Sequence, residues 1–251
     1  MERSFIFAPN LETILMKKII FATLLFVGLA FTSCEKDKEE HQSTNAIYLP
    51  AKIYGDSGPV TFKYDDKNRI VEMKEGDSNY TITTTLNYTG DLVTSAKVEE
   101  VTPENTYTSD YTFTYQGNNV MISYDDDPEP VDVFTIDDKG KLTGYEGGSI
   151  SYDSAGNIKK VTSPYDEYVF EYDTKNGVFK NVKTPHWLYV YLLDDYFFYL
   201  VNNCVKIDYK DVESSETDTQ TITYTYNTDN FPEKILFSNE DYYIKVEYTK
   251  K

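Results

Sequence analysis

A two-residue alternation of apolar and polar side chains runs through most of the chain from about residue 47 onward. In segment 80–88 the tyrosine, isoleucine and leucine side chains share one face, while threonines occupy most of the other. The pattern recurs at 107–115, 221–226 and 242–248. This period is typical of a β-strand with one buried face, and Tyr, Thr, Val, Ile and Phe fit a pleated sheet well. The sequence therefore predicts an all-β protein.

The expected strands end in a common form: an apolar residue, a polar one, Tyr, a polar turn and then an apolar residue. Clear copies stand at 62–70, 150–158 and 170–178, and degenerate copies end at 88–92, 115–120, 136–142 and 226–231. Asp or Asn can cap such a turn, and a later Gly or Asn can adopt the left-handed conformation that returns the chain as a hairpin. Because the spacing varies, we expect an antiparallel meander of roughly 13 to 16 strands that curls into a barrel-like wrap.

One segment breaks the alternation. Residues 187–201 are apolar on every side except at Asp194 and Asp195, which indicates full burial. Thr184 and Pro185 form a suitable helix start, so a short helix around 185–201 that plugs the curled sheet is favoured. A buried hairpin turning at Asp194 remains the alternative, because Tyr, Val and Phe prefer strands. Core filling is the expected role of this segment, since so dense an aromatic run is usually core.

The N-terminus has the layout of a bacterial export signal. Lys17 and Lys18 precede a run of about a dozen apolar residues, which is too short for a spanning helix. Small residues then lead to Cys34, in a pattern that resembles the lipobox of bacterial lipoproteins, although Phe31 stands where Leu is usual. We therefore expect Cys34 to be acylated.

This signal divides the chain into four predicted parts. Residues 1–15 read as an upstream extension, with translation starting at Met16, and 16–33 as the signal peptide. Residues 34–46 form an acidic tether that resembles the export signal of surface lipoproteins in Bacteroides-type bacteria. Residues 47–251 form a single β domain. The expected location is the outer membrane, facing the outside of the cell.

Two family resemblances follow from these motifs. The Tyr-Asp-x-x-Gly-Asn-Ile form at 152–158 resembles the YD repeats of bacterial shell-forming toxins, which build long β-meanders. The lipoprotein start together with the hairpins of 47–251 resembles an uncharacterised family of Bacteroides-type lipoproteins with a porin-like fold. This resemblance covers nearly the whole mature chain and implies architecture only, because the family offers no catalytic residues to carry over.

The residues that could carry chemistry are few. A Ser-His-Asp arrangement would need His186, because His41 lies in the tether, and the chain has no Gly-x-Ser-x-Gly elbow, so His186 is expected to be structural. Acylation of Cys34 would leave Cys204 without a partner, as a small buried residue. Glycoside hydrolysis needs only two carboxylates, but most acids here stand at turn positions, where capping and solvation explain them.

Neither a cofactor nor a resident metal is expected. The best calcium candidate comprises Asp125, Asp126, Asp127 and Glu129, but it lacks the spaced ligand pattern of a calcium loop. The formal charge of −18 argues against nucleic acid as a partner. The expected partners are the membrane, through the lipid at Cys34, and an extracellular glycan or protein. We expect a monomer.

Alternation alone leaves open which face of the barrel points outward. A membrane-spanning barrel is apolar outside, whereas a barrel in water is apolar inside. The Tyr-rich apolar face, the apolar plug and the lipid anchor favour the second arrangement. The sequence therefore predicts a surface-anchored, non-catalytic binding module. A polysaccharide-cleaving enzyme and a transmembrane β-barrel pore are the two alternatives, and the ligand stays open.

Overall fold

The computed structural model describes residues 46–55, 58–125, 130, 132–145, 147–192, 201–238 and 243–251. One compact unit spans Ile47–Lys251, and its described residues form a single antiparallel sheet and one short helix. Within the described residues, no helix combines the length and hydropathy needed to cross a membrane.

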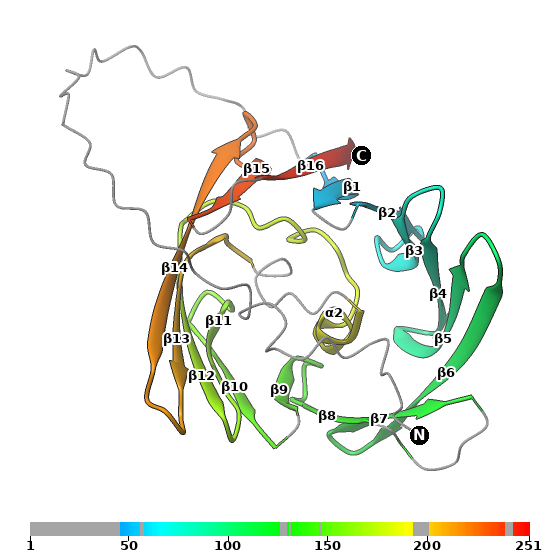
Figure 1. Ribbon diagram of the computed structural model, residues 1–251, viewed down its shortest axis with the longest axis horizontal. Helices are drawn as coiled ribbons and strands as arrows, with labels where there is room; N and C mark the ends of the chain where they lie inside the picture. Colours follow the sequence, from blue (N-terminus) through cyan, green and yellow to red (C-terminus); the bar gives the residue numbers. More distant parts are fainter. Residues whose placement is uncertain are drawn as a thin grey trace. The chain divides into compact units, whose positions relative to one another are not determined.

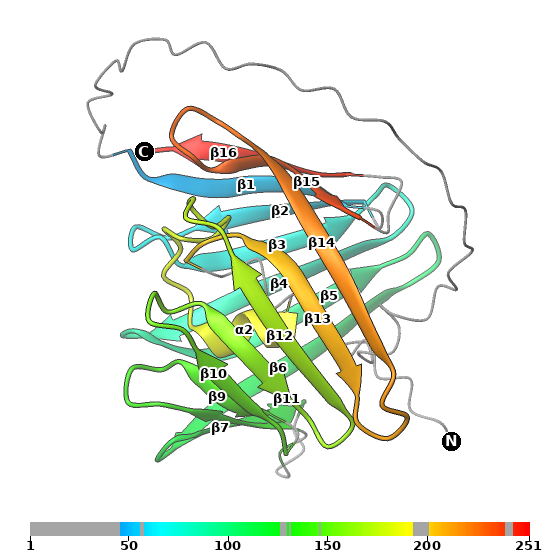
Figure 2. The same ribbon diagram turned by 90° about the vertical axis from the view of Figure 1, so that its left-hand side faces the viewer.

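The sheet has 16 strands that follow one another as an up-and-down meander (Figures 1 and 2). The strands are β1 Tyr48–Gly55, β2 Gly58–Tyr64, β3 Ile70–Gly76, β4 Thr81–Thr89, β5 Leu92–Val101, β6 Thr106–Gln116, β7 Asn119–Tyr124, β8 Asp132–Ile136, β9 Leu142–Tyr145, β10 Ser149–Tyr152, β11 Ile158–Thr162, β12 Asp166–Tyr172, β13 Cys204–Asp211, β14 Thr217–Tyr226, β15 Pro232–Phe237 and β16 Tyr243–Lys250. This confirms the predicted all-β meander.

The sheet curls into a nearly closed barrel. The first and last strands of the chain pair with each other, from Tyr48 opposite Lys250 to Tyr54 opposite Lys245. The strand order therefore begins at β10 and ends at β9, which are consecutive in the chain. Gly148 N donates to Tyr145 O at 2.8 Å in the connection between them, so the two ends of the sheet lie side by side.

The two faces of the wall differ in polarity. The buried side chains are almost all apolar, and in strands such as β4, β6 and β7 they alternate with more exposed ones. The inward face carries Ile53, Phe62, Met73, Leu86, Phe113, Ile122, Phe134, Phe170, Ile222 and Ile235. The outward face carries mainly Thr, Ser, Lys, Glu and Asp, so the apolar side of the predicted alternation lines the inside.

A barrel of 16 strands is too wide for its own wall residues to fill. The connection between β12 and β13 supplies further apolar residues, including helix α2 (His186–Leu192), which lies inside the ring of strands in Figure 1. The predicted helix is therefore confirmed for residues 186–192. The rest of the predicted plug up to residue 200, with the hairpin turn proposed at Asp194, lies outside the described residues.

Candidate functional site

Several clusters of hydrogen-bonded polar side chains lie at one end of the barrel. At this end the even-numbered strands finish and the odd-numbered strands begin. Aspartates shape the turns there: Asp65 accepts hydrogen bonds from the backbone N–H groups of Lys67 and Arg69, both at 2.9 Å. Asp137 and Asp153 do the same in their own turns. We call this end the plugged end, because the connection that carries α2 attaches there.

The predicted left-handed residues occupy these turns. They are Asn68, Gly90, Gly117, Gly140, Gly156 and Asn230, all with positive φ angles. Asn and Gly tolerate this conformation best, so the turn chemistry inferred from the sequence is confirmed at these six turns. The prediction was wrong for the copy at 170–178: neither Asn176 nor Gly177 has a positive φ angle, and after β12 the chain continues into the long connection to β13.

Tyrosines near the ends of the even-numbered strands form a second repeating feature at the plugged end. Each of seven hydroxyl groups donates a hydrogen bond to the main-chain carbonyl of a residue at or near the start of the preceding strand. The pairs are Tyr64 to Pro50, Tyr88 to Ile70, Tyr115 to Val93, Tyr152 to Leu142, Tyr172 to Ile158, Tyr224 to Cys204 and Tyr248 to Pro232, at 2.5–3.0 Å. We call this set the tyrosine girdle. At the end of β8, Ile136 stands in the corresponding place.

Burial keeps these hydroxyl groups protonated. It raises the pKa of Tyr88 and of Tyr115 to about 12. The pKa values of Tyr64 and Tyr172 rise further still for the same reason. The girdle therefore consists of neutral hydrogen-bond donors at any physiological pH, and its role is to join neighbouring strands.

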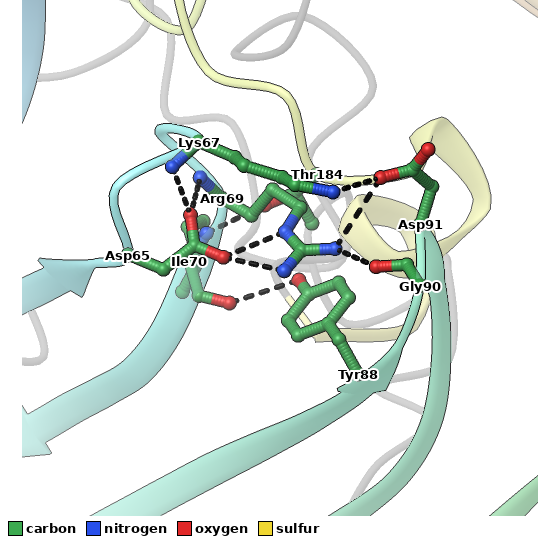
Figure 3. Close-up of polar contacts among 8 residues, drawn as sticks. All are labelled: Asp65, Lys67, Arg69, Ile70, Tyr88, Gly90, Asp91 and Thr184. Atoms are coloured by element: carbon green, nitrogen blue, oxygen red, sulfur yellow. Dashed lines mark hydrogen bonds and ion pairs between the residues drawn. The ribbon is translucent and has the colours of Figure 1, made fainter.

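Arg69 links two of the turns at the plugged end. Figure 3 shows its guanidinium between Asp65 and the turn at 90–91: Nε lies 2.7 Å from Asp65 Oδ2, and Nη1 donates to Gly90 O at 2.6 Å. The guanidinium also lies 4.1 Å from the ring centroid of Tyr88. Burial would raise the pKa of Asp65, but the hydrogen bonds and charge of Arg69 outweigh it and lower that pKa.

The same cluster holds the connection that carries α2. Thr184 Oγ1 accepts a buried hydrogen bond from Ile70 N at 2.8 Å (Figure 3). Lys183 N donates to Asn68 O at 3.0 Å. Trp187, the second residue of α2, is 1% exposed. Its ring contacts three aromatic rings of the wall: Phe113, Tyr115 and Phe134.

A cleft of about 720 Å³ opens beside this end, over β10, β11 and β12. Its base is a hydrogen-bonded network: buried Asn157 donates to Asp153 and to Asn202 Oδ1, both at 3.1 Å, and accepts from Asn202 N at 2.9 Å. Its exposed lining includes Lys159 and Glu171. Burial would raise the pKa of Asp153, but hydrogen bonds from Asn157 and from neighbouring backbone N–H groups lower it. The cleft thus offers fixed carboxylate and amide groups beside exposed charges of both signs.

The residues predicted to carry chemistry do not meet at one place in the described structure. Cys34 lies outside the described residues, as do Asp126, Asp127 and Glu129 of the calcium candidate. Asp125 Oδ1 accepts a hydrogen bond from Asp110 N at 3.0 Å. In the part of the chain that the structure describes, no three His, Cys, Asp or Glu side chains are grouped as metal ligands.

His186 and Cys204 both lie at the plugged end. His186 is the first residue of α2, and burial together with the positive charge of Lys141 lowers its pKa to about 4, against a smaller opposing effect of Asp137. Cys204 is buried, and burial raises the pKa of its thiol to about 12. A thiol with that pKa is a poor nucleophile.

The sequence analysis missed Arg69 and the network at Asn157. Arg69 is the single arginine after residue 33, and its place in a turn beside Asp65 was a usable signal for an ion pair. The Asn157 network was not accessible from the sequence, because Asn202 reaches it from a distance of 45 residues along the chain.

Comparison with known proteins gives two likenesses of fold. A porin-like protein from Bacteroides vulgatus ATCC 8482 aligns with 80% of this chain and 99% of its own, at 13% identity and a TM-score of 0.42. A porin-like protein from Bacteroides uniformis ATCC 8492 aligns with 82% of this chain and 97% of its own, at 14% identity and a TM-score of 0.33. No family model and no curated protein matches the chain. Both TM-scores lie below 0.5, so the barrel fold is assigned from the pairing of its own strands and not from these two structures.

Proposed function

We propose that the protein is an outer-membrane lipoprotein, anchored through acylated Cys34 and facing the outside of the cell, whose barrel binds a polar extracellular ligand without transforming it. The cleft over β10–β12 is the observation that carries the binding part of this proposal. Its volume falls in the usual range for a small-molecule site, roughly 300–1,000 Å³. The protein acts as a monomer, without a cofactor and without nucleic acid as a partner.

The chemistry of the cleft favours a glycan as the ligand. Asp153 is held by the network described above, so its carboxylate needs little reorganisation to accept a hydrogen bond. Asn157 is 1% exposed and both of its amide N–H groups already donate within the network, so its role is to hold Asp153 and Asn202 in place. Lys159 adds an exposed donor, and Glu171 adds an exposed acceptor whose Oε1 also pairs with Lys206 Nζ at 3.1 Å. Sugars present many hydroxyl groups in a small volume, and each hydroxyl group can both donate and accept a hydrogen bond. A lining that contains donors and acceptors therefore suits a sugar.

The outward face argues against the pore alternative. It carries charged pairs such as Lys160, at the middle of β11, with Glu167 on β12, whose Nζ and Oε2 atoms lie 2.8 Å apart. A lysine on the lipid-facing side of a barrel at the bilayer midplane costs about 2–4 kcal/mol. The inward face, by contrast, is apolar, as expected for a barrel whose wall faces water.

The anchor is tested by metabolic labelling with a fatty acid. The wild-type chain should incorporate the label, and the Cys34→Ala variant should not. Labelling that persists in Cys34→Ala would refute the anchor.

The ligand is tested by glycan binding with the full chain carrying Cys34→Ala, which keeps it free of lipid. Binding on a panel of neutral and charged glycans should weaken at least tenfold in the double variant Lys159→Ala, Glu171→Ala. A matched control removes the same two charges on β5, with Lys97→Ala and Glu99→Ala, and should bind as before. Equal losses in both variants would contradict the cleft as the site.

The same panel separates binding from catalysis. A glycan that is bound should be recovered intact after long incubation. Cleavage products that disappear when one cleft carboxylate is replaced, as in Glu171→Gln, would instead support the polysaccharide-cleaving alternative.

A further inference from the structure

The outward face of β15, β16 and β1 carries an unusual set of side chains. Lys234 on β15 stands directly opposite Lys245 on β16, and Lys245 stands opposite Tyr54 on β1. Two residues further along β15 and β16, Leu236 stands opposite Tyr243. The side chains of Leu236 and Tyr243 are 45% and 51% exposed. We call this set, together with Lys52 on β1, the lysine–tyrosine strip.

Like charges placed directly opposite each other destabilise an antiparallel pair. Elsewhere on the wall, lysines face acids across neighbouring strands. Such pairs are Lys63–Glu72, Lys160–Glu167 and Lys206–Glu171. Among the described residues beside the strip, one carboxylate serves two of its three lysines: Glu247 stands opposite Lys52, and its Oε1 lies 2.6 Å from Lys245 Nζ. In a chain with 42 acids and 24 bases, this local excess of lysine has no evident structural benefit.

Aromatic rings position the ammonium groups. Lys52 Nζ lies 4.5 Å from the ring centroid of Tyr54, and Lys245 Nζ lies 5.2 Å from the same centroid. Lys234 Nζ lies 4.8 Å from the ring centroid of Tyr243. These cation–π contacts hold three ammonium groups close to one another on the wall.

The strip lies on the strands that join the N-terminal segment to the barrel, roughly 13–26 Å along them from that junction at about 3.3 Å per residue. β1 follows directly on residue 47, whose backbone N–H and C=O groups pair with those of Lys251. The residues between Cys34 and β1 span at most about 45 Å when fully extended. A lipid on Cys34 would therefore keep the start of β1 within this distance of the membrane and the strip within roughly 26 Å more, so this step rests on the anchor of the proposed function.

We propose that the lysine–tyrosine strip docks the barrel onto a membrane surface that bears anionic headgroups. Lysines near such a surface attract its negative charge, and tyrosine and leucine fit the boundary between headgroups and acyl chains. A soluble anionic polysaccharide would pair with the lysines but would leave Leu236 unused. Docking through β15, β16 and β1 leaves the cleft uncovered, because β13 and β14 separate it from the strip (Figure 1).

Vesicle sedimentation tests the docking. The full chain with Cys34→Ala is mixed with vesicles of phosphatidylcholine alone, or of equal parts phosphatidylcholine and phosphatidylglycerol. The formal charge of −18 opposes binding to the anionic vesicles, so binding requires a local cluster of lysines such as the strip. We expect binding to the anionic vesicles only, and its loss when salt rises from about 0.1 to about 1 M, which shortens the Debye length from roughly 10 to roughly 3 Å.

Two sets of variants locate the contact. Replacing Lys52, Lys234 and Lys245 with Ala should weaken vesicle binding by about 100-fold, at about fivefold for each lysine near an anionic surface. Replacing Lys97, Lys160 and Lys210 with Ala changes the net charge equally on other strands and should have a much smaller effect. Leu236→Ser with Tyr243→Ser tests the apolar part and should weaken binding without changing its salt dependence.

Several outcomes would overturn the proposal. These are equal binding to neutral and anionic vesicles, equal losses in the two lysine variants, and retention on dextran sulfate without any vesicle binding. Because Cys34→Ala removes the lipid from every sample, failure here is distinguishable from failure of the anchor, which the fatty-acid label measures separately. A glycan that still binds at the cleft would likewise leave the proposed ligand site intact.

Discussion

The tyrosine hydroxyl is the smallest unit that repeats through this barrel. In the girdle, each hydroxyl supplies a donor to a main-chain carbonyl where the strand register shifts. Ile158, for example, lies opposite Tyr152, where the register of β10 and β11 shifts between Ser151 and Tyr152. A register shift leaves ladder groups without their regular partner. The hydroxyl of Tyr172 reaches Ile158 O at 2.5 Å and satisfies it. The Tyr of the sequence repeat is thus a hydrogen-bonding residue as much as an apolar one.

Removing one girdle hydroxyl should have a measurable cost. Tyr172→Phe keeps the ring but leaves Ile158 O without this donor, and we expect the free energy of unfolding to fall by about 1–3 kcal/mol. Urea unfolding measures the change. Tyr165→Phe is the control, because the Tyr165 side chain is 70% exposed and should tolerate the change within about 0.5 kcal/mol. Equal effects of the two substitutions would contradict a structural role for the girdle.

His186 makes stability depend on pH in a defined window. Its pKa is about 4 in the folded chain, because burial and Lys141 disfavour its protonated form, against an ordinary value of 6.5. As the pH falls from 6.5 toward 4, the unfolded chain therefore takes up a proton that the folded chain does not, and stability decreases by at most about 3 kcal/mol. His186→Asn should flatten this part of a plot of unfolding free energy against pH. An unchanged slope would contradict the lowered pKa.

At the scale of elements, the connection that carries α2 depends on a few polar contacts with the turns. Thr184 Oγ1 satisfies Ile70 N in a buried position, while Tyr88 satisfies Ile70 O at 2.9 Å. Both main-chain groups of Ile70 are therefore used outside the regular ladder. This couples the position of α2 to the turn that Arg69 and Asp65 hold in place.

Thr184→Val tests that coupling. Valine has the shape of threonine but cannot accept a hydrogen bond, so Ile70 N would remain buried and unpaired at a cost of about 1–3 kcal/mol. The single tryptophan, Trp187, reports on the position of α2: its emission should shift to longer wavelength if the helix leaves the inward face. Thr184→Ser should restore stability in large part. A Val variant with wild-type stability and emission would show that this contact does not hold the helix.

The sequence predicted the strands and turns well because their signals are local. Alternation fixes the faces of a strand, and Asp with a later Gly or Asn fixes a turn within five residues, as at 153–157. The helix at 186–192 was harder to predict, since Tyr and Val in α2 prefer strands and its stability depends on packing against distant rings such as Phe113. The cleft, the contacts of Arg69 and the strip each bring together residues from different turns or strands. No local pattern in the sequence indicates that these residues meet.

At the scale of the whole molecule, the barrel is joined least firmly at one seam. Fifteen neighbouring strand pairs form registered ladders, whereas β9 and β10 stand at the two ends of the strand order. Tyr152 OH donates to Leu142 O at 2.6 Å and bridges these two strands. Gly148 N donates to Tyr145 O at 2.8 Å in the turn between them. Closure therefore depends on one girdle bond and one main-chain hydrogen bond.

Hydrogen exchange should reveal this seam. Amide groups of β9 and β10 should exchange faster than those of β4 and β5, because they can open without unfolding the rest of the sheet. Tyr152→Phe should accelerate exchange in β9 and β10 by roughly fivefold to tenfold, the equivalent of about 1 kcal/mol. Tyr248→Phe removes the comparable bond to Pro232 O within the continuous part of the sheet, and it should leave β9 and β10 unchanged. Uniform acceleration across all strands in either variant would mean that the barrel opens as one cooperative unit and has no preferred seam.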